Sequence, residues 1–406
     1  MLSSPFLRAA LAWWSSRALL LLYAVHQPVP RGDVAYYFRG IEAEARGERA
    51  MSEYPDASIA PLRLLYRLVS GEEQAFAVGL MLVLLSLDAL LCYALARRRA
   101  WWALGFWLLF ALALAPLFTR RLDLLPGLAV AAAALSLRRS PRLSSGLVAV
   151  ATALKLWPVA LAAGLVGYWR SAGTWARLAW FGATLALVTA ASALTQGWWR
   201  VLSPLTYQDK RGLQSEAITA TPFLWLRLTD SERWSIHYAA SQSYEVFGPG
   251  VALGLHASTA LMAMAALGIV GFTAWRFLRS AEYSAEATRA LWLFTVMMIL
   301  LSAKVFSPQY LLWVGPLLAV ILALDAAPLG GSARSLRWCA ACLLGAAVLT
   351  SLVYPVFFDE FLAAPAHTGV VLIASLRNVL IVVAALCSAV WCLSAVRREA
   401  PRHRRR

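Results

Sequence analysis

The chain has 406 residues, of which 61% are hydrophobic and only 14% are charged. Soluble domains carry about 25% charged residues, so this composition excludes an ordinary soluble enzyme. The 37 Lys and Arg residues outnumber the 21 Asp and Glu residues and give a net charge of +16. Because most of the basic residues are arginines in short clusters between long apolar runs, we interpret them as topology signals and as an attraction for membrane lipid, and we expect no nucleic-acid partner.

Apolar stretches near twenty residues long recur along the chain and predict an all-α polytopic membrane protein. Arginine clusters mark the cytoplasmic ends of the spans, and most acidic residues fall in three outer loops, at about 26–74, 196–247 and 355–368. We expect a single integral membrane domain over residues 1–406, with both termini in the cytoplasm and a basic tail at 397–406. The predicted spans are about 6–25, 75–96, 101–118, 122–137, 178–195, 249–275, 288–303, 310–327, 337–354 and 370–395.

The stretch 144–168 decides the number of crossings. The arginines before it, Arg138 to Arg142, and those after it, Arg170 to Arg177, both indicate the cytoplasmic side. A single crossing would put one of these clusters on the outer side. Because proline removes a backbone donor and interrupts a helix, we expect two half-spans broken at Trp157-Pro158, with Lys155 at the turn. This interpretation predicts about twelve crossings.

The first outer loop carries a candidate catalytic acid. Asp33 follows the first span directly and has Tyr36 and Phe38 beside it, and the run 58–69 has the pattern of an interfacial amphipathic helix. An acid held just outside the membrane is well placed to act as a general base on a lipid-linked group. The alternative is a solvated carboxylate that caps a helix or pairs with Arg31.

The second outer loop contains a candidate anion site. Lys210 and Arg211 can neutralise a phosphate, and the adjacent Gly212 lets the backbone approach it. The alternative is a solvated turn before a short helix.

Isolated ionisable residues within apolar sequence are further candidates, because charge at membrane depth is costly. They are Arg120, Arg121, Asp123, Lys155, Lys304 and Arg377. For Arg120, Arg121 and Arg377, snorkelling toward the lipid headgroups is the alternative. Asp88 lies in mid-span without an obvious partner, so we expect a packing or cavity residue there, and Arg17 is similarly ambiguous.

Several motifs are absent from the sequence. It has no D-x-D, no Walker A glycine loop and no H-E-x-x-H, and its five histidines are scattered. We therefore expect no metal site and no cofactor. The five cysteines all map near cytoplasmic ends of spans, which argues against an exported disulfide framework.

Five motifs together resemble the membrane glycosyltransferases of family 87, in the C-type superfamily, over residues 6–395. In chain order they are Gly32-Asp33-Val34 with Tyr36, Glu53-Tyr54-Pro55, Lys155-x-x-Pro158, Arg211 to Glu216, and Lys304-x-x-Ser307-Pro308-Gln309-Tyr310. The relatives most resembled are polyprenol-phosphate-mannose-dependent mannosyltransferases. One motif departs from the family pattern, since Tyr54-Pro55-Asp56 stands where members often have Tyr-Pro-Pro.

The resemblance implies a C-type glycosyltransferase fold and a catalytic Asp33. The implied reaction moves a monosaccharide, mannose by analogy, from a polyprenyl-phosphate donor to a glycolipid or glycan acceptor with inversion, on the extracytoplasmic face of the cell membrane. The residues expected to bind the donor phosphate are Lys304, Arg211, Lys210, Arg377, Arg120 and Arg121. Those expected to bind the substrates are Tyr36, Tyr54, Gln214, Glu216, Gln309 and Lys155.

Two other classes of function remain open. A transporter or flippase of lipid-linked sugars would also place basic residues and a broken helix at membrane depth. Such a protein would spread its charges over both leaflets of one pathway, whereas here they collect on the predicted outer side. The second of these classes is a purely structural membrane subunit without enzymatic activity.

Overall fold

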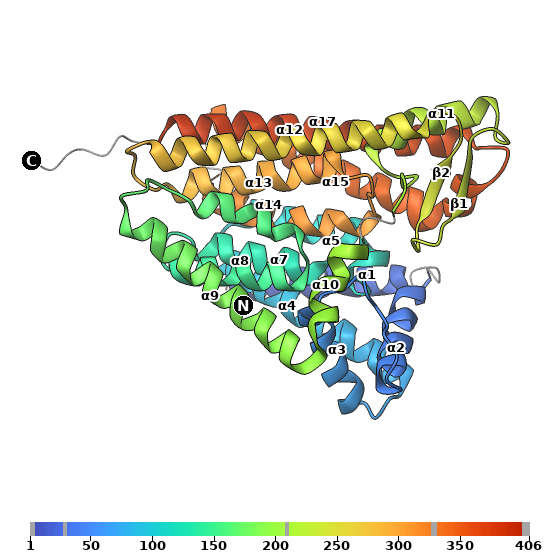
Figure 1. Ribbon diagram of the computed structural model, residues 1–406, viewed down its shortest axis with the longest axis horizontal. Helices are drawn as coiled ribbons and strands as arrows, with labels where there is room; N and C mark the ends of the chain where they lie inside the picture. The colour runs from blue at the N-terminus through green and yellow to red at the C-terminus, as the bar shows by residue number, and fades with distance from the viewer. Residues whose placement is uncertain (1–4, 27–30, 208–210, 326–330, 400–406) are drawn as a thin grey trace, which may run out of the picture. The chain divides into compact units, whose positions relative to one another are not determined.

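The computed structural model describes residues 5–26, 31–207, 211–325 and 331–399, and this part of the chain is mostly helical (Figure 1). Seven of its helices are long and apolar enough to cross a membrane, which confirms the prediction of a helical membrane protein. The seven segments are Glu73–Arg97, Ala172–Gln196, Val251–Leu278, Ala285–Ser302, Pro308–Asp325, Arg334–Val356 and Thr368–Arg397.

Other predicted spans are helical but differ from these seven. The predicted span 6–25 is helix α1 (Pro5–Val25), and 101–118 and 122–137 contain shorter apolar helices of 13 residues each. The number of crossings therefore stays a prediction. Part of the predicted basic tail, residues 400–406, lies outside the described residues, as does Lys210.

The chain divides into two compact units, and each is described by itself. Unit 1 comprises Met1–Leu165, Ala172–Asp209 and Leu312–Leu324. Its elements are α1, α2 (Arg31–Ala45), α3 (Asp56–Leu68), α4 (Glu73–Arg97), α5 (Trp101–Ala113), α6 (Ala115–Phe118), α7 (Leu124–Ser136), α8 (Pro141–Leu154), the 3₁₀ helix η1 (Trp157–Leu165), α9 (Ala172–Gln196), α10 (Trp198–Tyr207) and nearly all of α14 (Leu311–Asp325).

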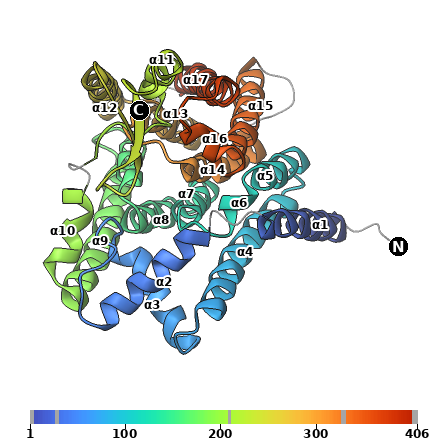
Figure 2. The same cartoon turned by 90° about the vertical axis from the view of Figure 1, so that its right-hand side faces the viewer.

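Helices α1, α4 and α5 lie next to one another in unit 1 (Figure 2). A buried ion pair joins them: Arg17 Nε donates to Asp88 Oδ2 at 2.7 Å and Arg17 Nη2 donates to Asp88 Oδ1 at 2.8 Å. The indole N–H groups of Trp13 and Trp107 donate to the same carboxylate, each at 2.7 Å. Asp88 therefore has a partner that the sequence alone did not show, 71 residues away on another helix, and as a buried residue between packed helices it agrees with the packing residue expected there.

The break predicted within 144–168 is present. Helix α8 ends at Leu154, Lys155 has an extended backbone and η1 begins at Trp157. Lys155 thus lies at the interruption, as predicted, although the second half is a 3₁₀ helix. Whether the two halves return to the same side of the membrane stays a prediction.

The first predicted outer loop is largely helical. Helix α2 occupies its beginning, and α3 coincides with the predicted amphipathic helix over 58–69 and buries Ile59 and Leu62. The side chain of Glu72 caps α4 by accepting hydrogen bonds from Gln74 N and Ala75 N. The expected catalytic residue therefore lies on a helix and not on a flexible loop.

Unit 2 comprises Val166–Ser171, Lys210–Leu311 and Asp325–Arg406. Its long helices α12, α13 and α17 run side by side, and α15 packs along α17 (Figure 1). Its elements are η3 (Ile218–Ala220), α11 (Thr221–Thr229), β1 (Ser235–Tyr238), β2 (Tyr244–Phe247), α12 (Val251–Leu278), α13 (Ala285–Ser302), η4 (Pro308–Tyr310), α15 (Gly331–Ser351), the π-helical turn η5 (Leu352–Val356), α16 (Phe358–Leu362) and α17 (Thr368–Arg397).

A small β-hairpin in unit 2 departs from the all-α prediction. Strands β1 and β2 pair antiparallel, with Ile236 opposite Val246. Both of these side chains are buried, while the neighbouring His237 is exposed, so the hairpin has one apolar face. Two four-residue strands are too short for their alternation to be separated from loop sequence.

Candidate functional site

Asp33 lies in the first turn of α2, where its carboxylate pairs with Nη1 of Arg121. The side chain of Asp33 is 27% exposed and that of Arg121 is 10% exposed. Burial raises the pKa of Asp33, Arg121 opposes this rise and the nearby Asp123 adds to it. Asp33 is therefore a stronger proton acceptor than an ordinary surface aspartate, and its side chain stays partly accessible.

A second carboxylate, Asp123, lies immediately before α7 and is 1% exposed. Its Oδ1 accepts hydrogen bonds from Lys155 Nζ at 2.5 Å and from Trp313 Nε1 at 2.6 Å. Its Oδ2 is buried and has no hydrogen-bond partner in the described part of the chain. Two acids and two bases thus meet here, and we call Asp33, Arg121, Asp123 and Lys155 the Asp33 cluster.

Asp123 is not among the predicted binding or catalytic residues, although Arg121 and Lys155 are. The available signal was its position among isolated charges in apolar sequence. That signal could not show that Asp123 joins α7 to the end of α8 and to α14, because these contacts span 32 and 190 residues.

Two tyrosines expected to bind substrate lie near the Asp33 cluster. The Tyr36 hydroxyl donates to Glu53 Oε1 at 2.5 Å, and the Tyr54 hydroxyl lies 3.3 Å from the hydroxyl of the buried Tyr37. Burial raises the pKa of Tyr36, Tyr37 and Tyr54. All three hydroxyls therefore stay neutral near pH 7 and can donate hydrogen bonds.

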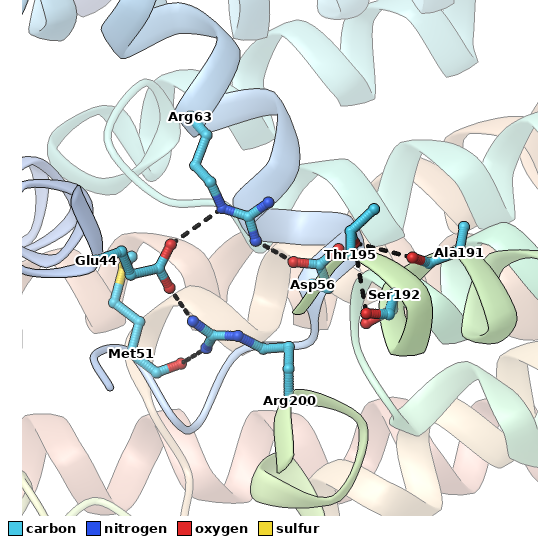
Figure 3. Close-up of polar contacts among 8 residues, drawn as sticks. All are labelled: Glu44, Met51, Asp56, Arg63, Ala191, Ser192, Thr195 and Arg200. Atoms are coloured by element: carbon cyan, nitrogen blue, oxygen red, sulfur yellow. Dashed lines mark hydrogen bonds and ion pairs between the residues drawn. The ribbon is translucent and has the colours of Figure 1, made fainter. Parts of the chain in front are cut away.

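A second charged network holds the other end of α2 (Figure 3). The Glu44 carboxylate accepts from Arg63 Nε at 3.0 Å and pairs with Nη2 of Arg200, while Arg63 also pairs with Asp56. Arg200 is fully buried and its Nη1 donates to the carbonyl oxygen of Met51 at 2.9 Å. This Glu44 network ties α2, α3 and α10 together, so the helix that carries Asp33 is held at both ends.

The candidate cations of unit 2 are held differently. Arg377 is fully buried on α17, and its Nη1 pairs with the Glu216 carboxylate while Nη2 donates to the Glu216 carbonyl oxygen at 2.8 Å. Its Nε donates to Asn378 Oδ1 at 3.1 Å. Glu216 is also buried, and burial raises its pKa against the opposing effect of Arg377. In this arrangement the guanidinium is committed to the protein's own acceptors.

The backbone at Gly212 also faces a protein group. Gly212 N donates to Glu245 Oε1 at 3.0 Å, and a Cβ atom at this position would lie 2.2 Å from Glu245 Oε2. Ser243 Oγ donates to the same carboxylate at 3.1 Å, and Ser241 Oγ does so as well. In this structure the backbone amide of Gly212 is bound to Glu245, and the predicted anion site at Lys210 and Arg211 stays a prediction.

The remaining expected residues of unit 2 gather near the end of α13. Lys304 is half-buried just beyond this helix, and its carbonyl oxygen accepts from Gln214 N at 2.9 Å. Gln214 is 8% exposed and its Oε1 has no hydrogen-bond partner in the described residues. Gln309, on η4, accepts a hydrogen bond from Ser307 Oγ. Arg211, which precedes Gln214 closely in the sequence, is half-buried.

The expected site residues thus fall in two groups, one in each unit. Unit 1 holds Asp33, Tyr36, Tyr54, Arg120, Arg121 and Lys155, and unit 2 holds Arg211, Gln214, Glu216, Lys304, Gln309 and Arg377. No group of three or more His, Cys, Asp and Glu side chains that could hold a metal ion is found in the described residues. That the reaction needs no metal stays a prediction.

Comparisons with family models, with curated proteins and with solved structures found no match to this chain.

Proposed function

We propose that the protein is a glycosyltransferase of the C-type superfamily, which moves a monosaccharide from a polyprenyl phosphate to a hydroxyl of a glycolipid or glycan. The observation that supports this most is the Asp33 cluster, in which a partly exposed carboxylate of raised pKa lies in the first turn of a helix that directly follows an apolar one. The resemblance to family 87 adds the same residue as the catalytic position.

In the proposed reaction Asp33 takes the proton of the acceptor hydroxyl. The acceptor oxygen then bonds to the anomeric carbon as the bond from that carbon to the phosphate oxygen breaks, and the polyprenyl phosphate leaves with the electron pair. Attack from the face opposite the leaving phosphate inverts the anomeric configuration. Arg121 orients the Asp33 carboxylate, and Lys155 is bound to the neighbouring Asp123.

The developing phosphate charge needs fixed cations. Arg120 is the proposed ligand in unit 1. Lys304, Arg211 and Lys210 belong to the sequence of unit 2 and stay predicted phosphate ligands on the resemblance alone. Arg377 is bound to Glu216 and Asn378. It therefore contributes to phosphate binding through its electrostatic field, and it can contact a phosphate directly only if the Arg377–Glu216 ion pair breaks.

The proposed topology follows the arginine clusters. It has about twelve crossings of the cell membrane, cytoplasmic termini, and the Asp33 cluster on the extracytoplasmic face. Single cysteines at Ser140 and Ser171 should both resist a membrane-impermeant thiol reagent added to intact cells. Labelling of either one would contradict the pair of half-spans around Lys155.

The direct test is transfer by the purified full chain in lipid nanodiscs. A panel of polyprenyl-phosphate sugars is offered with an extract of cell-envelope glycolipids, products are identified by mass spectrometry, and the anomeric configuration of the new linkage is determined. We expect an inverted product that Asp33→Asn abolishes and Glu48→Gln, a change at an exposed surface carboxylate, does not. Flipping of the lipid-linked sugar without any transfer would instead support the transporter.

A further inference from the structure

A cavity of about 490 Å³ lies in unit 1 between α1, α2, α4 and the connection from α6 to α7. Its walls are mostly apolar and include Leu21 and Val25 of α1, Val34 of α2, and Val78 and Met81 of α4. We call this cavity the α1–α4 groove. It falls within the size range of specific small-molecule sites, about 300–1,000 Å³.

The groove has a polar end as well as an apolar one. Thr119 and Arg120 line it from the α6–α7 connection, and Glu72, Glu73 and Gln74 line it from the start of α4. The Glu72 carboxylate already accepts hydrogen bonds from Gln74 N and Ala75 N. Arg120 Nη2 donates to the carbonyl oxygen of Ala24 at 2.6 Å, which holds the guanidinium at the end of α1. A molecule that fits both ends must itself be amphiphilic.

The charges at the polar end narrow the class of ligand further. One guanidinium suits one phosphate, since it can donate two parallel hydrogen bonds to it. The carboxylate of Glu73 and the amide of Gln74 suit hydroxyl groups. A carboxylate accepts hydrogen bonds from hydroxyls, and an amide both accepts hydrogen bonds from them and donates hydrogen bonds to them. A head with one phosphate and several hydroxyls satisfies all of these groups at once.

We propose that the α1–α4 groove binds the lipid-linked sugar, with its chain against α1 and α4, its phosphate at Arg120 and its sugar toward Glu73 and Gln74. The apolar wall of α4 from Ala77 to Met81 extends over about 6 Å of helix, so the groove holds only the part of the chain next to the head. The remainder of the chain lies in the membrane.

The groove shares its framework with the Asp33 cluster. Val34 follows Asp33 on α2, and Arg120 precedes Arg121, the partner of Asp33. A lipid head at the polar end would therefore lie against the same helix and the same connection that position the acid. The identity of the ligand as substrate rests on the proposed function, whereas the location and chemistry of the groove come from its own residues.

Photo-crosslinking tests the proposal. The full chain in phosphatidylcholine nanodiscs is titrated with a polyprenyl monophosphate that carries a diazirine on its first isoprene unit, and the labelled peptides are mapped by mass spectrometry. We expect labels on α1 and α4 that excess unlabelled polyprenyl monophosphate removes and inorganic phosphate does not.

Two kinds of variant probe the two ends. Ala77→Trp, or Met81→Trp if the first folds poorly, fills the apolar wall, and Arg120→Gln removes the charge. Each should raise the dissociation constant for the probe by about tenfold or more. Leu90→Trp is the matched control, because Leu90 lies on the same helix, is 63% exposed and is not in the groove.

The outcomes separate this inference from the proposed function. Labelling that survives both tryptophan variants, or that phosphatidylglycerol displaces as well as polyprenyl monophosphate does, would overturn the groove assignment. Expected binding without transfer of any sugar would retain the groove and reject the glycosyltransferase. The third outcome is sugar transfer that depends on Asp33 but is unchanged in Ala77→Trp, Met81→Trp and Arg120→Gln. This outcome would retain the glycosyltransferase and reject the groove.

Discussion

Two of the arginine–aspartate pairs in unit 1, Arg17–Asp88 and Arg121–Asp33, differ in how fully the carboxylate is bound. Asp88 is fully buried and accepts hydrogen bonds from Arg17, Trp13 and Trp107, so its two oxygens receive four N–H donors. Asp33 receives Arg121 as its one side-chain donor found in the described residues, and 27% of its side chain is exposed. A carboxylate offers about four acceptor sites. All acceptor sites of the Asp88 carboxylate are therefore used, whereas the Asp33 carboxylate has several acceptor sites left for a reactant.

The same difference recurs in unit 2. Arg377 is fully buried and bound to Glu216 and Asn378, whereas Lys304 is half-buried just beyond α13. Charge at membrane depth marks a residue as a candidate. The number of partners already bound then separates a structural pair from a group that can meet a substrate.

The largest expected effect is on turnover in Asp33→Asn. Asparagine keeps the size of the side chain and can still accept a hydrogen bond from Arg121, but it cannot take a proton. Turnover should fall by roughly 10²–10⁴-fold while binding of the lipid donor is retained. Steady-state transfer kinetics of the purified variant measure this.

The exposed Glu48, which pairs with Arg46, supplies the control. Glu48→Gln should transfer sugar at the wild-type rate. If Asp33→Asn does so too, the incompletely bound carboxylate is not the base and the comparison with Asp88 loses its functional meaning.

Asp88→Asn should mainly change stability. The substitution leaves the guanidinium of Arg17 buried without its counter-charge, and breaking such a pair costs about 3–5 kcal/mol. The free energy of unfolding in mixed micelles measures the loss. The double variant Arg17→Met with Asp88→Leu should recover much of it, because no unpaired charge remains buried. A variant Asp88→Asn as stable as the wild type would show that the pair is not structural.

Much of this fold could be predicted from local sequence. Long apolar stretches gave the helices, the amphipathic pattern gave α3, and Pro158 with the flanking arginines gave the interruption at Lys155. The hairpin could not be predicted in this way, because two four-residue strands carry too little alternation.

The candidate site was predictable as a set of residues and not as a set of contacts. The cost of charge in apolar sequence identified Arg121, Lys155 and Arg377. Their partners Asp33, Asp123 and Glu216 lie 88, 32 and 161 residues away in sequence, so only the packed helices reveal which charges neutralise one another. The hydrogen bond from the Gly212 amide to Glu245 could not be predicted either, because these two residues also lie far apart in sequence.

Smaller effects are expected for the cations of unit 2. Lys304→Ala should weaken use of the lipid donor by about 1.5–3 kcal/mol, the contribution of a charge-assisted hydrogen bond, with unfolding unchanged. Arg211→Ala should behave in the same way. Donor titrations at fixed acceptor concentration measure the change. Arg377→Met is the informative contrast, since it leaves Glu216 buried and unpaired and should lower stability. Unchanged donor kinetics in both alanine variants would remove these two residues from the phosphate site.

The smallest expected effect is a shift in the pH profile of Asp123→Asn. Asp33 acts as a base only when deprotonated, so kcat/KM falls as the pH drops through the pKa of Asp33. The charge of Asp123 raises that pKa and the charge of Arg121 lowers it. Asp123→Asn should therefore move the acid limb of the profile to lower pH, and Arg121→Gln should move it to higher pH. Asparagine can still accept hydrogen bonds from Lys155 and Trp313, so the fold around the cluster is retained. Opposite shifts in these two variants require that Asp33 itself titrates in the profile, whereas an acid limb that neither variant moves would assign the base to another residue.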